Sequence, residues 1–260
     1  MALPPIGAHI WGEAPFAEAE EIGADIVQLF LSNPQGWEKP PPRDDASELK
    51  AADLGIYVHA PYLINVCSPK PNVRFGSRKI LNQTCEAAEA IGALAVIVHP
   101  GHAEDGLEEG VARWTSTLER METSVPVYLE NTAGGENAVA RRFDALARLW
   151  EAVEAAKTDV PYGFCFDPCH AHAAGEDLSD AVERAIGITG GIDLMHVNDS
   201  RDKAGTGADR HTTIGEGHID LDDLRHMVAT ANAPTVVETP REVDLQKADM
   251  AFVREALSGA

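Results

Sequence analysis

Eight short apolar segments, separated by alanine- and leucine-rich stretches with helical spacing, organise this 260-residue sequence. The apolar segments are rich in β-branched residues and nearly continuous, which is typical of parallel strands buried on both faces. Strand and helix alternate along the whole chain without a linker or a break in composition. The predicted strands span residues 6–10, 26–30, 56–59, 95–99, 125–130, 162–167, 192–196 and 235–238. The predicted helices span residues 46–54, 77–91, 111–121, 142–155, 179–186, 221–231 and 245–257.

Eight such units in about 250 residues fit a closed (β/α)8 barrel. We therefore predict an α/β fold, a TIM barrel, formed by residues 1–260 as a single domain. Gly23, Gly55 and Gly92 each precede a strand and are expected to end helices in the left-handed conformation. An open doubly wound sheet is the alternative, but no glycine-rich phosphate-binding motif follows the first strand.

Neither membrane insertion nor secretion is indicated by the sequence. The longest purely apolar run covers the six residues 93–98, whereas a membrane-spanning helix needs about 20. No basic stretch followed by an apolar block opens the chain, as a secretory signal would require. Four cysteines are too few for a disulfide framework at this length. We therefore expect a soluble, reduced, cytoplasmic protein that does not contact a membrane.

Polar side chains stand at the carboxyl end of every predicted strand. Because the carboxyl ends of parallel barrel strands lie on one rim, these side chains should converge at the barrel mouth. Crowded carboxylates and imidazoles are costly unless cations are bound among them. The strand ends carry, in chain order, His9, Gln28, His59, His99, Glu130, Asp167, His196 and Glu238.

Two further segments add candidate metal ligands. His170 follows Asp167 by three residues, and Asp209 and His211 lie on a long glycine-rich loop with a spacing that lets both bind one ion. Nine candidate ligands result, five histidines and four carboxylates. One ion takes about four to six ligands, so nine ligands predict two or three ions. Imidazole and carboxylate ligands without a thiolate favour Zn²⁺, with Mn²⁺ or Fe²⁺ as permitted substitutes.

The sequence resembles the endonuclease IV family of apurinic/apyrimidinic endonucleases over essentially its whole length. Nine motifs carry the resemblance and occur in the family's order. They are Gly7-Ala8-His9, residues 29–37 (LFLSNPQGW), residues 59–65 (HAPYLIN), His99-Pro100-Gly101, residues 130–134 (ENTAG), residues 167–175 (DPCHAHAAG), residues 196–200 (HVNDS), Asp209-Arg210-His211 and Glu238-Thr239-Pro240. The resemblance implies a (β/α)8 barrel with three zinc ions that cleaves DNA on the 5′ side of an abasic site.

The resemblance also assigns the nine side chains to three zinc ions. The first ion would be bound by His59, His99 and Glu130, the second by Glu130, Asp167, His196 and Glu238, and the third by His170, Asp209 and His211. His9 and Gln28 are left out of this set and are expected to support the ligands or pack beside them. Asn131, Asn198 and Asp199 each neighbour a ligand and are expected to orient it.

The metals suggest the chemistry. A water molecule shared between two zinc ions would attack the phosphorus 5′ to the abasic site, leaving a 3′-hydroxyl and a 5′-deoxyribose phosphate. Glu130 and Glu238 are the carboxylates expected to orient the attacking hydroxide, and the sequence does not rank them.

The predicted partner is double-stranded DNA that contains abasic sites. Such an enzyme flips the nucleotide out of the duplex and fills the gap with side chains. The resemblance gives this role to Tyr62 and Leu63, and Gln35 stands where some family members place an inserting arginine. Arg210 is a further expected DNA contact. No obligate protein partner is indicated, so we expect a monomer that acts at the nucleoid.

The net charge opposes this prediction. The 21 basic and 42 acidic residues give −21, whereas DNA affinity rests largely on basic groups that neutralise phosphates. However, 12 of the 21 basic residues fall on predicted loops of the metal-bearing rim, so we expect a positive mouth on an acidic body. They are Lys39, Arg43, Lys70, Arg74, Arg78, Lys79, Arg141, Arg142, Arg201, Lys203, Arg210 and Arg241.

Two other functions remain open from the sequence. A xylose isomerase-like sugar isomerase or epimerase also carries rim histidines and carboxylates, but uses one or two divalent ions, and the third site here argues against it. A non-catalytic nucleic-acid binder of the same fold would show decayed ligands, and none of the nine is substituted. Metal stoichiometry separates the nuclease from the isomerase.

Overall fold

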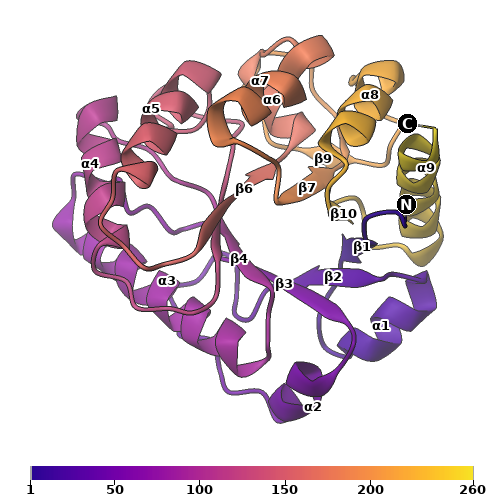
Figure 1. Cartoon of the computed structure of the whole chain (residues 1–260), viewed down its shortest axis with the longest axis horizontal. Coiled ribbons are helices and arrows are strands. Elements are labelled where there is room, and N and C mark those ends of the chain that lie inside the picture. Colours follow the sequence, from indigo (N-terminus) through magenta and orange to yellow (C-terminus); the bar gives the residue numbers. More distant parts are fainter. Residues whose placement is uncertain (1, 260) are drawn as a thin grey trace.

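Eight parallel strands close into a barrel, and the helices surround it on the outside (Figure 1). The structure is a computed structural model that describes residues 2–259. The strand order around the barrel is β1-β10-β7-β6-β5-β4-β3-β2. The strands are β1 (Ile6–His9), β2 (Ile26–Leu29), β3 (Gly55–His59), β4 (Ala95–Val98), β5 (Val127–Glu130), β6 (Tyr162–Phe166), β7 (Leu194–Val197) and β10 (Thr235–Val237). The TIM barrel prediction is confirmed; residues 1 and 260 of the predicted domain lie outside the described chain.

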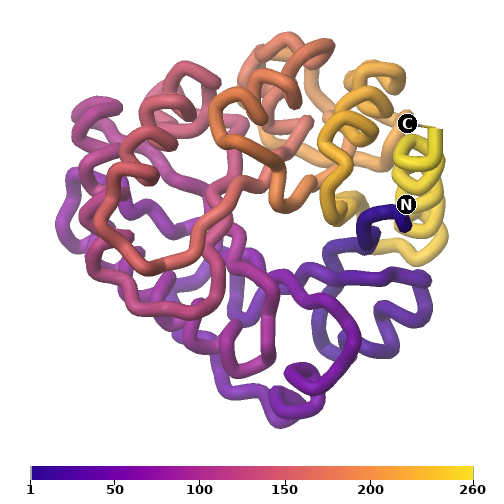
Figure 2. Tube along the Cα trace, in the orientation of Figure 1, coloured from indigo at the N-terminus to yellow at the C-terminus, as the bar shows by residue number. Residues whose placement is uncertain are grey.

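Closure of the barrel depends on β1, which pairs on both sides and so excludes the open sheet. Ala8 is opposite Val27 of β2 on one side and opposite Val237 of β10 on the other. A Cβ at Gly7 would lie 1.6 Å from the carbonyl oxygen of Ile26, so only glycine permits this approach. The two ends of the described chain therefore meet: the last helix packs against β1 (Figure 2).

The helices match most of the predicted stretches, with differences at the starts and the ends of several of them. They are α1 (Pro15–Ile22), α2 (Ala46–Ala51), α3 (Pro71–Ala90), α4 (Leu107–Leu118), α5 (Phe143–Glu154), α6 (Pro168–Ala174), α7 (Ala181–Thr189), α8 (Leu221–Ala231) and α9 (Val243–Ser258), with a 3₁₀ turn η1 (Leu178–Asp180). α3 begins at a proline well before the predicted residue 77, because proline is suited to the first turn of a helix. Among residues 2–259, none of these helices combines the length and apolarity that crossing a membrane demands.

The left-handed helix ends were predicted correctly at two of three glycines. Gly23 and Gly92 have φ angles of 70° and 71°. The prediction for Gly55 is wrong, because this residue begins β3 and α2 has already ended beside an extended Ala52. A Cβ at Gly55 would lie 2.7 Å from Ile26 Cγ2, so the glycine serves the close packing of β2 and β3.

Two elements above the barrel were not predicted and both shape the site. α6 starts immediately after β6: Asp167 caps it by accepting a hydrogen bond from the His170 amide at 2.8 Å, and Pro168 follows in the first turn. β8 (Asp199–Ser200) and β9 (His211–Thr212) form a short antiparallel hairpin after β7, with Ser200 opposite His211. The hairpin folds the long loop back over the barrel mouth.

Candidate metal centre

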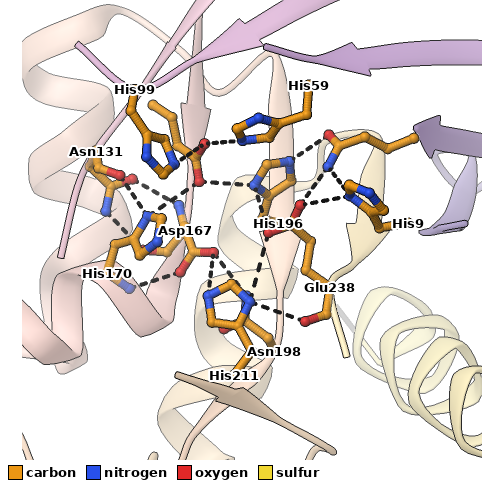
Figure 3. Close-up of polar contacts among 12 residues, drawn as sticks. His9, His59, His99, Asn131, Asp167, His170, His196, Asn198, His211 and Glu238 are labelled. Atoms are coloured by element: carbon orange, nitrogen blue, oxygen red, sulfur yellow. Dashed lines mark hydrogen bonds and ion pairs between the residues drawn. The ribbon is translucent and has the colours of Figure 1, made fainter. Parts of the chain in front are cut away.

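The nine candidate ligands converge at the carboxyl end of the barrel, although they come from six strand ends, one helix and one hairpin loop. Figure 3 shows His59, His99, Asp167, His170, His196, His211 and Glu238 around this point. Most of them are buried, and Glu130, Asp167 and His196 have no exposed surface. Asp209, with a side chain 42% exposed, is the most accessible of the set. The fold thus brings together side chains that are 179 positions apart, from residue 59 to residue 238.

Glu130 lies at the centre, with imidazoles on both carboxylate oxygens. Its Oε2 lies 3.3 Å from His59 Nε2 and 3.1 Å from His99 Nε2. Its Oε1 lies 3.0 Å from His196 Nδ1 and 3.2 Å from His170 Nδ1. A carboxylate with donors on each oxygen has the arrangement needed to bridge two cations.

Glu238 and Asp167 extend the cluster on the side of β7 and β10. Glu238 Oε2 lies 3.5 Å from His196 Nδ1, and the Glu130, Asp167, His196 and Glu238 side chains offer ligand atoms within 4.8 Å of one another. His59, His99 and Glu130 form a second such group. These two groups have the same members as the first two zinc sites that the family resemblance assigns.

The third group is assembled by α6 and the β8–β9 hairpin. His170 Nε2 lies 3.2 Å from Asp209 Oδ2, and His211 Nε2 lies 2.9 Å from Asp209 Oδ1. His211 Nε2 also approaches Asp167 Oδ2 at 3.8 Å. By mutual distance, the compact groups here are Asp167 with both histidines, and Asp209 with His211 and Cys169. Asp167 therefore adjoins both the second and the third group.

The residues present fit divalent metal ions. Two ligand atoms at tetrahedral positions, each about 2.1 Å from a zinc ion, are about 3.4 Å apart, close to the separations around Glu130 and Asp209. Moreover, the buried Nε2 atoms of His170 and His211 have no hydrogen-bond partner among residues 2–259, although Asp209 oxygens lie near them. Short contacts without hydrogen-bond alignment are expected when both groups point at a common cation.

Two thiols lie beside these groups. Cys165 Sγ lies within 4.8 Å of ligand atoms of Glu130 and His196, and Cys169 Sγ within 4.8 Å of ligand atoms of Asp209 and His211. Burial raises the pKa of Cys165 to about 12, so this thiol stays protonated at neutral pH. Imidazole and carboxylate groups remain the dominant donors of the cluster.

Without metal, the cluster is held together by imidazolium–carboxylate attraction. Burial alone would raise the pKa of Glu130, but His196 and His99 hold it well below its usual range. Burial alone would lower the pKa of His170, but Asp167 and Asp209 raise it well above its usual range. In both cases the attraction between opposite charges exceeds the cost of desolvation.

Gln28, on β2, and His9, on β1, support the cluster. Gln28 Nε2 donates to Glu238 Oε1 at 2.5 Å, and its Oε1 accepts from His196 Nε2 at 2.8 Å. His9 Nδ1 lies 3.3 Å from Glu238 Oε1. Burial lowers the pKa of His9 to about 4, so this imidazole is neutral at neutral pH. These contacts fix the orientation of one carboxylate and one imidazole, as the sequence suggested for both residues.

Two of the three expected orienting residues contact the ligands. Asn198 Nδ2 donates to Asp167 Oδ2, and the Asn131 carbonyl accepts from His170 Nδ1, each at 2.8 Å. The expectation for Asp199 is wrong. Its carboxylate accepts from the amides of Gly215, Gly217 and Ile219 at 2.9 to 3.0 Å, and so organises the loop backbone after the hairpin.

Exposed side chains surround the mouth where DNA contacts were predicted. Tyr62 is 50% exposed although its ring packs 5.3 Å from that of His59, and Leu63 is 36% exposed. Gln35 is exposed on the loop after β2, whose Pro34 carbonyl accepts from the Tyr62 amide. Arg210 is exposed too, but its guanidinium is bound by the Asp202 carboxylate. This ion pair offsets the charge that a phosphate contact would use.

The basic residues are less concentrated on the rim loops than expected. Arg74, Arg78 and Lys79 lie within α3, because that helix begins earlier than predicted. Arg78 donates to Thr117 of α4 and so joins two helices. Several others form ion pairs with carboxylates, including Lys39, Arg43, Lys70 and Arg142. The positive mouth predicted from the sequence is therefore reduced.

Cavities at the mouth were not foreseen from the sequence. One of about 230 Å³ is lined by ligands and rim residues including His99, His102, Thr132 and Asp209. A second, of about 100 Å³, is lined by His9, Tyr62, His211, Glu238, Thr239 and Arg241. A larger cavity of about 590 Å³ beside Arg141 is away from the cluster. The second cavity joins predicted ligands and the predicted DNA contact Tyr62 to Arg241, one of the basic residues assigned to the rim loops from the sequence.

Fold and site together define a barrel with a polar, cation-accepting mouth, and known proteins share this architecture. The profile of the family described as xylose isomerase-like TIM barrel matches residues 16–256. Endonuclease IV from Thermus thermophilus superposes with a TM-score of 0.83 at 26% identity, covering 99% of this chain and 100% of that one. An L-ribulose 3-epimerase superposes with a TM-score of 0.76 at 18% identity, covering 99% and 95%, so the fold alone does not separate the two activities.

The sequence relatives distinguish between the endonuclease and the epimerase. A protein of Mycobacterium bovis (strain BCG / Pasteur 1173P2) named probable endonuclease 4 is 56% identical over 252 residues, which cover 96% of this chain and 98% of that one. A probable endonuclease 4 of Mycobacterium marinum is 54% identical over 255 residues, covering 97% and 99%. The chain therefore belongs to the endonuclease IV family, as its motifs indicated.

Proposed function

We propose that this protein is a DNA repair endonuclease that hydrolyses the phosphodiester bond on the 5′ side of abasic sites with three zinc ions. The observation that carries the proposal is the third group of ligands, His170, Asp209 and His211, beside two groups that share Glu130. A sugar isomerase of the same fold needs no such third site. Membership of the endonuclease IV family supports the same reaction.

The bound ions would lower the pKa of water toward neutrality and neutralise charge on the phosphate oxygens. The nine ligands would hold these ions. The two carboxylates proposed to orient the attacking water differ in accessibility. Glu130 is fully buried with imidazoles on both oxygens, whereas Glu238 lines the 100 Å³ cavity. We assign the contact with the water to Glu238, and to Glu130 the holding of the histidines.

The reaction needs no nucleophilic side chain. Water loses a proton and attacks phosphorus in line with the leaving 3′ oxygen. The P–O3′ bond breaks, and the 3′ oxygen takes up a proton from the solvent. The products are a 3′-hydroxyl and a 5′-deoxyribose phosphate. We assign to Tyr62 and Leu63 the entry into the duplex where the abasic nucleotide leaves it, and their exposure beside the ligands supports this role. Gln35, on the adjacent loop, can hydrogen-bond to DNA but does not supply a charge.

The protein's setting follows from its substrate. We propose that it acts in the cytoplasm at the nucleoid, as a monomer that needs no protein partner. Light scattering of the purified protein should give the mass of one 27.8 kDa chain. A stable dimer would contradict the monomer but not the reaction.

The decisive experiment combines metal analysis with one defined substrate. Purified protein should contain about three zinc ions per chain and nick a duplex on the 5′ side of a single tetrahydrofuran site. His170→Ala should abolish the nick and lower the zinc content. His226→Ala is the matched control, because His226 pairs with Glu183 on the outer helices at 2.8 Å, far from the cluster. About one metal per chain and an intact duplex would refute the nuclease and favour the isomerase.

A further inference from the structure

Arg241 is one of several basic residues near the barrel mouth without a carboxylate partner among residues 2–259, and it lines the same cavity as Glu238. It lies on the loop between β10 and α9, three residues after Glu238, and is partly buried. Within residues 2–259 it forms no ion pair and no hydrogen bond, whereas Arg210 and Arg43 are bound by Asp202 and Asp45. In a protein of net charge −21, a cation left without a carboxylate beside a catalytic cluster needs an explanation.

An exposed tryptophan stacks on this arginine. The Arg241 guanidinium carbon lies 4.1 Å from the ring centroid of Trp11, a geometry typical of cation–π contacts. Trp11 lies on the loop between β1 and α1, and is 68% exposed. The two loops are neighbours because β1 and β10 are paired strands (Figure 1). Stacking limits the guanidinium's freedom without neutralising its charge.

The guanidinium borders the metal cluster. Arg241 lines the 100 Å³ cavity together with Glu238, His211 and Tyr62. Its other side lines a cavity of about 80 Å³ with Trp11. The first cavity has room for several water molecules, and therefore for phosphate oxygens. His9, another wall residue, has its buried Nε2 without a hydrogen-bond partner among residues 2–259.

We propose that Arg241, held by Trp11, binds a phosphate group of the DNA strand at the cavity beside Glu238, and that this contact strengthens substrate binding at the metal cluster. A planar guanidinium suits two phosphate oxygens at once. The inference rests on the proposed nuclease function. Arg241 therefore takes part of the role that the sequence gave to Arg210.

Steady-state cleavage of the tetrahydrofuran duplex tests the contact. Arg241→Gln should lower kcat/KM by about 10- to 100-fold, because a charged hydrogen-bond donor is lost. It should also reduce the slope of log Kd against log salt by about one. Arg241→Lys should restore the salt slope but only part of kcat/KM. Trp11→Leu should cost about 2- to 5-fold, and should add nothing once Arg241 is already glutamine.

The matched control is Arg225→Gln, since Arg225 also stacks on an aromatic ring, at 4.8 Å from Phe252, but on the outer helices. It should leave both measurements unchanged. Thermal unfolding of every variant shows whether the fold is retained. An unchanged salt slope in Arg241→Gln, or an equal loss in Arg225→Gln, would overturn the proposal.

A sharper test replaces single phosphates. Neutral methylphosphonate linkages, placed one at a time around the abasic site, should weaken binding by the wild-type protein at several positions. At one of these positions the methylphosphonate should not weaken DNA binding by Arg241→Gln any further, whereas it should weaken binding by Arg225→Gln as much as binding by the wild type. Fluorescence anisotropy reads this out independently of cleavage. Binding of the abasic duplex without nicking would refute the proposed function alone. The phosphate contact would be refuted if wild type and Arg241→Gln lost affinity equally at every methylphosphonate position, or if the protein did not bind DNA.

Discussion

Two layers of side chains fill the barrel interior, and they differ in chemistry although the same strands supply both. The lower layer is apolar and contains Ile26, Tyr57, Ile97, Tyr128, Cys165, Leu194 and Val236. Two residues further along each of these strands comes the upper, polar layer: Gln28, His59, His99, Glu130, Asp167, His196 and Glu238. Residues two apart on a strand face the same side, so one geometry builds both layers about 6.6 Å apart.

The comparison separates stability from function. The apolar layer gains free energy by leaving water. The polar layer loses hydration and is tolerated because its opposite charges pair with one another, and would pair with cations. Substitutions in the lower layer should therefore lower the stability of the fold, and substitutions in the upper layer should change metal content and activity.

The largest expected effect is on activity, from the polar layer. Glu130→Gln removes the charge that faces four imidazoles and should lower the nicking rate by at least ~10³-fold, with loss of bound zinc. Circular dichroism should still show the native fold. Glu183→Gln, in the exposed pair with His226, should keep wild-type activity. If Glu130→Gln nicks normally, the cluster is not the catalytic site.

The apolar layer should respond in stability. Ile97→Ala, in a fully buried position two residues before His99, should lower the free energy of unfolding by about 2–5 kcal/mol, because a cavity is left. Urea denaturation measures this, and the folded fraction should retain its zinc. Leu94→Ala, at a residue 46% exposed, should change stability by less than about 0.5 kcal/mol. Loss of zinc from folded Ile97→Ala would show that the layers are coupled.

A smaller effect is expected from the residues that support the ligands. Gln28→Leu removes the hydrogen bonds to Glu238 and His196 at almost constant volume. Zinc affinity should fall by about 10- to 100-fold, which competition with a chelator measures. Wild-type affinity in this variant would mean that packing alone orients the two ligands.

The smallest expected effect is the change of stability with pH in the metal-stripped protein. The pKa of His170, His196 and His211 is raised in the folded state. Their stabilisation is therefore complete below the unfolded pKa of about 6.5, and is lost as pH rises through the folded values. The thermal midpoint of stripped protein should fall by a few degrees from about pH 6.5 to about pH 9. A rise would contradict the charge pairing.

At acid pH the dependence is reversed, and stability should fall as the pH is lowered. Glu130 and Glu238 have lowered pKa values, so their stabilisation is present above the unfolded value of about 4.3 and is lost as pH falls through the folded values. His9, with its pKa lowered to about 4, also favours unfolding as pH falls below about 6.5. Protons also compete with zinc for the histidines, so zinc affinity should fall as the pH is lowered.

Most of the fold and the strand-end residues could be predicted because their signals are local. A buried strand is readable from a few apolar residues, and its carboxyl end follows from chain direction. α6 and the β8–β9 hairpin could not be predicted from such local patterns. α6 has seven residues, too few for a clear helical periodicity, and β8 and β9 pair across ten intervening residues. Asp199 illustrates the limit: its amide partners are 16 to 20 positions away.

The sequence by itself determined a barrel of eight alternating units, the chemical types of its rim side chains and the family. The tertiary structure decided which groups face one another. It places four imidazoles around Glu130, folds His211 over the barrel mouth and gives Arg210 and Arg241 different partners. Asp202 neutralises Arg210, whereas Trp11 stacks on Arg241 and leaves its charge free. The physical reason is that strand periodicity is a property of neighbouring residues, whereas pairing of charges depends on distances that only the closed barrel sets.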